Sequence, residues 1–89
     1  MTTRERISAF MEGEEALLLE PEIFDEAIIG IAERCGQPPL VAYDRARCIE
    51  ILMREGMDHE EAEEFYEFNT AGAWMGEGTP IFIDTRWAE

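Results

Sequence analysis

Six carboxylates fall within the ten residues 58–67, whose sequence is DHEEAEEFYE. They are Asp58, Glu60, Glu61, Glu63, Glu64 and Glu67. Folded as a helix, this run carries one negative charge per roughly 2.5 Å of its axis, close to the one per about 1.7 Å along duplex DNA. Carboxylates at this density suit two kinds of chemistry. They hold divalent cations, or they offer a basic protein surface a substitute for phosphates.

Metal chemistry is the less favoured of these two interpretations. His59 and Glu63 have the i,i+4 spacing that could share a divalent ion, and Glu61 and Glu64 have the ExxE spacing that holds magnesium in all-helical nucleotide pyrophosphohydrolases. Such an enzyme needs a second acidic pair on a facing helix, and outside this run only Glu12–Glu15 has the spacing. A magnesium-dependent nucleotide hydrolase using helix glutamates is therefore an alternative function. The chain has no serine nucleophile motif, zinc-finger spacing or glycine-rich phosphate loop, so we expect no catalytic residue, no metal and no cofactor.

A helix from Asp58 to about Trp74 would position these acids. Asp58 and Glu61 form a capping box that starts it, which leaves four acids free for function. At 100° per residue, the expected core face holds Ala62, Phe65, Tyr66, Asn69 and Ala73. The predicted binding site lies nearly opposite and consists of Glu60, Glu63, Glu64 and Glu67, with Trp74 beside them.

A solvated surface is the commonest role of an acidic helix face, and acids near a helix N-terminus interact favourably with its dipole. Against this, like charges spaced i,i+3 and i,i+4 each cost a few tenths of a kcal/mol. No base is interleaved within this helix to offset the repulsion. The cost favours a binding role, although a face that is only solvated remains the simpler interpretation.

The other expected elements are mostly helices. A first helix over residues 3–12 starts at the capping box of Thr2 and Glu5. A second follows Pro21 and ends at Gly36, because Phe24, Ala27, Ile28, Ile31 and Cys35 share one face. A third covers residues 45–55, with Asp44 as its N-cap and with Cys48, Ile49, Leu52 and Met53 facing inward. Short strands at 40–43 and 81–83 could pair. We therefore expect a single α+β domain, 1–89, mostly helical, with three to four helices packed with a short two-stranded β ribbon.

The net charge of −14 limits the partners. Direct binding to nucleic acid or to anionic lipid is disfavoured, because the attraction to phosphates becomes repulsion. No apolar run is long enough to span a membrane and the N-terminus lacks an export signal, so a cytoplasmic protein is expected. Cys35 and Cys48 have no ligand-like spacing and are interpreted as reduced core residues.

A resemblance over about residues 20–83 rests on an ordered set of segments: FDEAIIG (24–30), GQPP (36–39), CIEILM (48–53), EGM followed by EEAEEF (55–57 and 60–65), and FNTAGAWMGEGTP (68–80). The chain resembles small acidic proteins encoded by bacteriophages, prophages and bacteria, a group without an assigned activity. The resemblance implies a bacterial host cell and transfers no catalytic residue.

The sequence thus favours a non-enzymatic interaction protein. In this hypothesis it is a phage-encoded inhibitor that presents the carboxylate face to a basic, nucleic-acid-binding surface of a host protein. A third hypothesis is a self-associating structural protein, a homodimer with Ile29, Phe68 and Trp74 at the contact.

Overall fold

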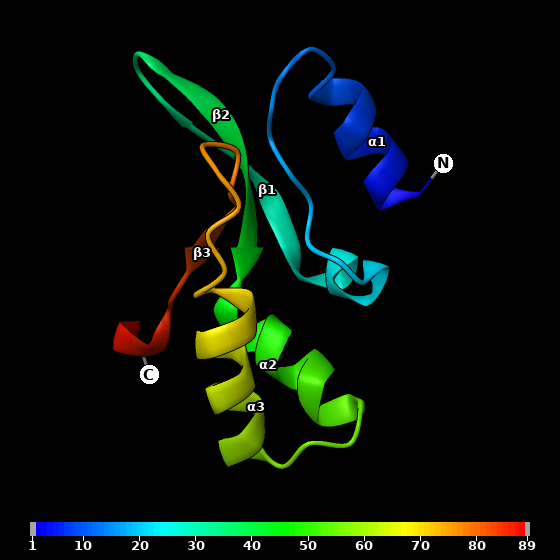
Figure 1. The fold of residues 1–89 in the computed structure, drawn as a ribbon, viewed down its shortest axis with the longest axis vertical. Helices are drawn as coiled ribbons and strands as arrows, with labels where there is room; N and C mark the ends of the chain where they lie inside the picture. The colour runs from blue at the N-terminus through cyan, green and yellow to red at the C-terminus, as the bar shows by residue number, and fades with distance from the viewer. Residues whose placement is uncertain (1, 89) are drawn as a thin grey trace.

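The computed structural model describes residues 2–88 and contains a three-stranded sheet with helices beside it and at one end (Figure 1). In chain order the elements are α1 (Thr3–Phe10), the 3₁₀ helix η1 (Glu22–Ala27), β1 (Ile28–Arg34), β2 (Gln37–Asp44), α2 (Arg45–Arg54), α3 (His59–Phe65), the π-helical turn η2 (Tyr66–Thr70), β3 (Ile81–Ile83) and the 3₁₀ turn η3 (Arg86–Ala88). The strand order is β1-β2-β3, with β1 antiparallel and β3 parallel to β2.

The sheet corrects the expected fold class. Residues 40–43 and 81–83 do pair, with Ala42 opposite Ile81 and Tyr43 opposite Phe82. The expected two-stranded ribbon is nevertheless wrong, because β1 adds a third strand on the other side of β2 and makes a mixed sheet.

The extra strand comes from the segment that was expected to be the second helix. Only residues 22–27 are helical, as a 3₁₀ helix, and residues 28–34 are extended. Ile28, Ile29 and Ile31 have β-branched side chains, which favour strands, and Gly30 disfavours a helix interior. The turn that follows places Cys35 in solvent instead of in the core. Gly36 adopts a φ of 79° there, a left-handed conformation that glycine reaches without strain.

Two prolines lie inside β2, although the sequence suggested that they precede it. Pro38 and Pro39 fall in an irregular interval of the β1–β2 register, between the pairs Ala32–Leu40 and Arg34–Gln37. β3 pairs with β2 only from Ala42 onward. The missing proline N–H groups therefore interrupt no regular ladder position.

The core lies where the sheet meets α2 and α3. Its buried members are Leu19, Phe24, Ala27, Val41, Tyr43, Cys48, Ile49, Ile51, Leu52, Ala62 and Tyr66. The expected helix at 45–55 is confirmed, with two corrections. Ile51 is buried where Met53 was expected, and Asp44 occupies the N-cap position without a side-chain capping hydrogen bond.

The N-terminal part is fastened by polar contacts. α1 begins at the expected Thr2–Glu5 capping box, ends earlier than expected, at Phe10, and has no buried residue. The Arg4 guanidinium donates to both carboxylate oxygens of Asp25 and, at 2.7 Å, to the carbonyl oxygen of Leu19. Asp25 raises the pKa of Arg4 through these hydrogen bonds. The Leu19 N–H donates to the buried Tyr43 hydroxyl at 2.8 Å.

Residues 14–20 connect α1 to η1 and reach the loop before β3. The Leu17 N–H donates to the carbonyl oxygen of Gly78 at 2.9 Å. Within residues 2–88, no helix combines the length and the apolar character that a bilayer span requires.

Candidate functional site

The acidic helix starts where its sequence predicts. Asp58 Oδ1 accepts from the Glu61 N–H at 2.9 Å, and Glu61 Oε1 accepts from the Asp58 N–H at 3.4 Å, which completes the capping box. The α-helix ends at Phe65, however, and does not reach Trp74. The next turn is a π turn, closed by the Ala71 N–H donating to the Tyr66 carbonyl oxygen at 2.7 Å.

The buried face of this helix differs from the expected one. Ala62, Tyr66 and Thr70 are buried, whereas Phe65 is 38% exposed and Asn69 is exposed. The buried arc is therefore rotated by roughly 50° from the arc expected for an ideal helix. The rotation follows from a tertiary contact. The Tyr66 ring packs edge-on against Phe82 of β3, with 5.6 Å between ring centroids.

Two of the predicted binding carboxylates already have a partner. Arg45 is buried at the start of α2, and its Nη2 lies 3.2 Å from Glu63 Oε2 and 3.5 Å from Glu67 Oε1. The Arg45 guanidinium also lies over the Tyr66 ring, 5.2 Å from the centroid. A base from another helix thus offsets part of the repulsion that α3 was expected to carry. Of the four acids predicted to bind a partner, Glu63 and Glu67 therefore lie beside Arg45, whereas Glu60 and Glu64 do not.

Glu60 and Glu64 form the open part of the acidic face. Both are exposed, and within residues 2–88 neither has a base within ion-pair distance. Their i,i+4 spacing places them about 6 Å apart along the helix axis. Phe68, one turn further on, is 74% exposed. The solvent-facing side of α3 and η2 therefore combines two unpaired carboxylates with an exposed aromatic ring.

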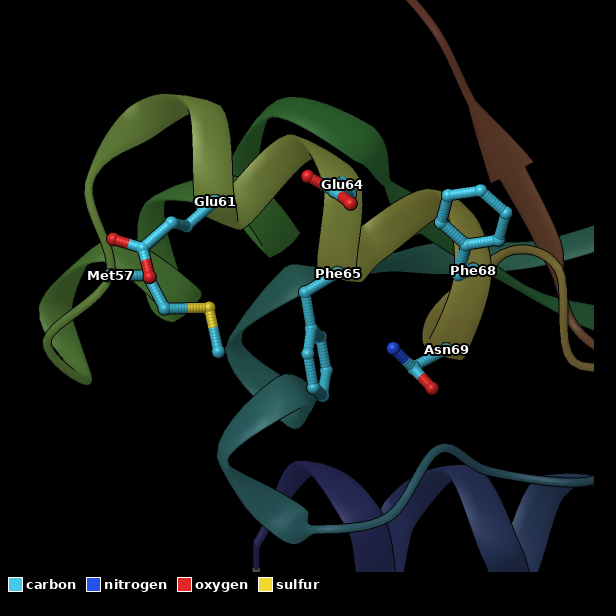
Figure 2. Close-up of a pocket in the computed structure, with 6 residues that line it drawn as sticks. All are labelled: Met57, Glu61, Glu64, Phe65, Phe68 and Asn69. Carbon is cyan, nitrogen blue, oxygen red and sulfur yellow. The ribbon is translucent and has the colours of Figure 1, made fainter.

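A groove runs along the same side of the helix (Figure 2). It is a shallow depression, largely open to solvent, with a volume of about 320 Å³, and it is lined by Met57, Glu61, Glu64, Phe65, Phe68 and Asn69. Figure 2 shows the Met57 thioether and the Phe65 ring pointing into the same space, with the Glu61 carboxylate beside Met57. The sequence projection did not identify this groove, because it assigned Phe65 and Asn69 to the core. The i, i+4, i+7 series of Glu61, Phe65 and Phe68 is the signal that could have indicated it.

Trp74 lies in a different environment from the carboxylates that were expected to be its neighbours. It is 73% exposed and helps to line a hollow of about 670 Å³ between the β1–β2 hairpin and the loop 71–80. The walls of this hollow also include Arg34, Leu40, Glu77 and Pro80. None of the α3 glutamates lines it.

The groups that could do covalent or metal chemistry are not assembled into a site. Residues 2–88 contain no group of three or more His, Cys, Asp or Glu side chains placed to hold a metal ion. His59 Nδ1 lies 3.3 Å from Glu63 Oε1, an i,i+4 contact on the helix surface. Burial raises the pKa of the Cys48 thiol to about 12 and that of the Tyr66 hydroxyl to about 12, so both are neutral at physiological pH.

Comparisons with known proteins identify no relative. No family model, curated protein or solved structure matches the chain.

Proposed function

We propose that this chain is a non-enzymatic interaction protein that presents the exposed side of α3 to a basic surface of a protein partner. The observation that carries the proposal is the pair Glu60 and Glu64, exposed and without a base partner in the described part of the chain, beside the exposed Phe68 ring. Unpaired acids next to an exposed aromatic residue combine the steering charge and the apolar anchor that protein interfaces use.

The charge of the whole chain supports a cationic partner. With a net charge of −14, the field around the protein attracts basic surfaces and repels acidic ones. Basic surfaces that bind nucleic acid are the strongest class of such partners, since they are built to meet closely spaced negative charges. Blocking such a surface on a bacterial host protein, in the cytoplasm, is the activity that we propose. Glu63 and Glu67 contribute less to it than Glu60 and Glu64, because Arg45 already neutralises part of their charge.

The alternative functions have less support. The second acidic pair that a magnesium-dependent hydrolase requires is not assembled near α3 in residues 2–88. The residues proposed for a homodimer contact line three different hollows: Ile29 between α1 and β1, Phe68 along α3, and Trp74 beside the hairpin. A single two-fold contact through all three is therefore not favoured.

A titration with octa-arginine tests the proposal without knowledge of the natural partner. The ¹⁵N-labelled chain is titrated at low and at moderate salt, and the amide shift changes are followed by NMR. We expect the largest changes at residues 60–68 and weaker binding as salt rises. The double variant Glu60→Gln/Glu64→Gln should bind the peptide about five- to tenfold more weakly.

The matched control is Glu12→Gln/Glu14→Gln, which removes the same charge from exposed positions outside α3. If both double variants weaken binding equally, only net charge matters and α3 is not a specific site. That result contradicts the proposal, as does a wild-type chain that shows no shift change at residues 60–68.

A further inference from the structure

The groove along α3 has three apolar residues in its lining, beside three polar or charged ones, and a purely electrostatic contact does not require them. Met57 is half-buried against the core, Phe65 is 38% exposed, and Phe68, at 74%, is among the most exposed aromatic residues of the chain. All three line the groove, and Figure 2 shows the Met57 and Phe65 side chains reaching toward each other, whereas the Phe68 ring extends from η2 in another direction. Exposed apolar side chains that line a concavity indicate contact with a partner.

We propose that this groove receives a large apolar side chain from a basic amphipathic helix of the partner. The inference rests on the proposed function and deepens it, because it names the element of the partner that binds and the contact that orients it. Met57 suits such a groove, since its unbranched thioether adapts to the shape of an inserted side chain and packs well against aromatic rings.

The rim of the groove selects the charge of the occupant. Glu64 is exposed and has no base partner within residues 2–88, and Glu61 uses one carboxylate oxygen for the capping box. Bases that flank an inserted apolar side chain would meet these two carboxylates. A second copy of this chain is a poor occupant, because each copy carries a net charge of −14.

The geometry of the groove favours a helix as the occupant. Its lining follows one face of α3 and η2 at the i, i+4, i+7 positions Glu61, Phe65 and Phe68. A partner helix with an apolar residue between bases at i±3 or i±4 repeats the same spacing, so apolar side chains meet the groove floor while bases meet the acidic rim. An extended basic peptide carries the positive charge, but it does not place an apolar side chain between bases with that spacing.

Two synthetic peptides of identical leucine and lysine composition test the inference. In one, the leucines share a single helix face. In the other, they are distributed around the helix. The affinity of the full chain for each peptide is measured by calorimetry at physiological salt, where exposed charges are screened. We expect the amphipathic peptide to bind at least tenfold more tightly than the scrambled one.

Phe68→Ser should remove about tenfold of the affinity for the amphipathic peptide. Phe10→Ser is the matched control, since Phe10 on α1 is 77% exposed and lies outside this groove, and we expect it to leave the affinity unchanged. A chain labelled at its methionine methyl groups gives a readout that needs no variant. The Met57 signal should shift on binding, whereas that of the buried Met11 should not.

Equal affinity for the two peptides, an unaffected Phe68→Ser variant, or an unshifted Met57 signal would each overturn this inference. A different result would contradict the proposed function: octa-arginine binding that does not depend on Glu60 and Glu64. If that dependence is present while Phe68 has no effect, the acidic face binds and the groove does not. If it is absent, both proposals fall.

Discussion

Replacing Arg45 with alanine should destabilise the fold more than replacing either of the other α2 arginines that form ion pairs. Its side chain is 7% exposed, and its guanidinium joins α2 to Glu63 and Glu67 of the acidic helix while it covers the Tyr66 ring. Alanine would remove the charge, the contact with the ring and the packed aliphatic stem together. Two acids one turn apart would then face each other without a base between them.

The size of the effect follows from how exposed each contact is. Breaking a fully buried pair by removal of one partner costs about 3–5 kcal/mol. The Glu63 side chain is about one-third exposed and can regain water, so its contact with Arg45 lies below that range. The cation–π contact adds about 1 kcal/mol, and the more exposed Glu67 adds a few tenths. We therefore expect Arg45→Ala to lower the free energy of unfolding by about 3 kcal/mol.

Urea unfolding followed by circular dichroism measures this difference. Arg47→Ala is the matched control. Arg47 is on the same helix and its Nη1 lies 3.3 Å from Glu50 Oε2, but the two side chains are 45% and 64% exposed. It should cost at most about 0.5 kcal/mol. In a double-mutant cycle, Arg45→Met and Glu63→Gln should couple by about 1 kcal/mol. Equal costs for Arg45→Ala and Arg47→Ala, or no coupling in the cycle, would refute the reasoning.

Two further perturbations have expected outcomes. Gly78→Ala should cost about 2 kcal/mol in urea unfolding, because its Cβ would lie 2.0 Å from the Glu15 carbonyl oxygen. Gly30→Ala, with no atom within 4 Å of the new Cβ, should be nearly neutral, and equal effects of the two would contradict this explanation. Stability should also fall as pH rises from about 9 to about 12, because burial raises the pKa of Cys48 and of Tyr66 in the folded state, and the unfolded chain releases both protons first. In a pH series of unfolding curves, Cys48→Ala should reduce this loss, and an unchanged slope would argue against the role of the thiol.

The parts of the fold that depend on short-range chemistry could be predicted from the sequence. Both capping boxes form as expected, because a side chain at the N-cap and one three residues later bond to each other's backbone N–H groups without any help from the rest of the chain. The helix at 45–55 was also located correctly, since its apolar spacing and its ending at Gly56 are local signals.

Residues 28–35 show where periodicity is ambiguous. Ile28 and Ile31 are three apart, which fits a helical face, but the same residues also fit a half-buried strand that contains an irregularity. The β-branched composition and Gly30 both favour the strand over the helix that the spacing alone predicts. Pairing with β2 decides between helix and strand here, and the sequence of residues 28–35 alone carries no information about that pairing.

The candidate site could be predicted only in part, for a different reason. The acids of α3 were found from their spacing, but Arg45 is 18 positions before Glu63, and no local pattern joins them. The orientation of the helix depends on the packing of Tyr66 against Phe82, which brings in a third strand. Tertiary contacts therefore decide which glutamates pair with Arg45 (Glu63 and Glu67) and which remain unpaired (Glu60 and Glu64).

The parallel pairing of β3 has a consequence for the order of folding. The β1–β2 hairpin closes over a two-residue turn, whereas Ala42 and Ile81 are 39 positions apart in the sequence. Joining strands so distant in the chain costs about 2 kcal/mol more in loop entropy than closing the hairpin. The hairpin and α2 can thus form early, and β3 docks late, onto an already formed β2. Because Phe82 arrives with β3 and packs on Tyr66, the acidic helix would reach its final orientation only in this last step, and substitutions at Phe82 would mainly accelerate unfolding and leave the folding rate nearly unchanged.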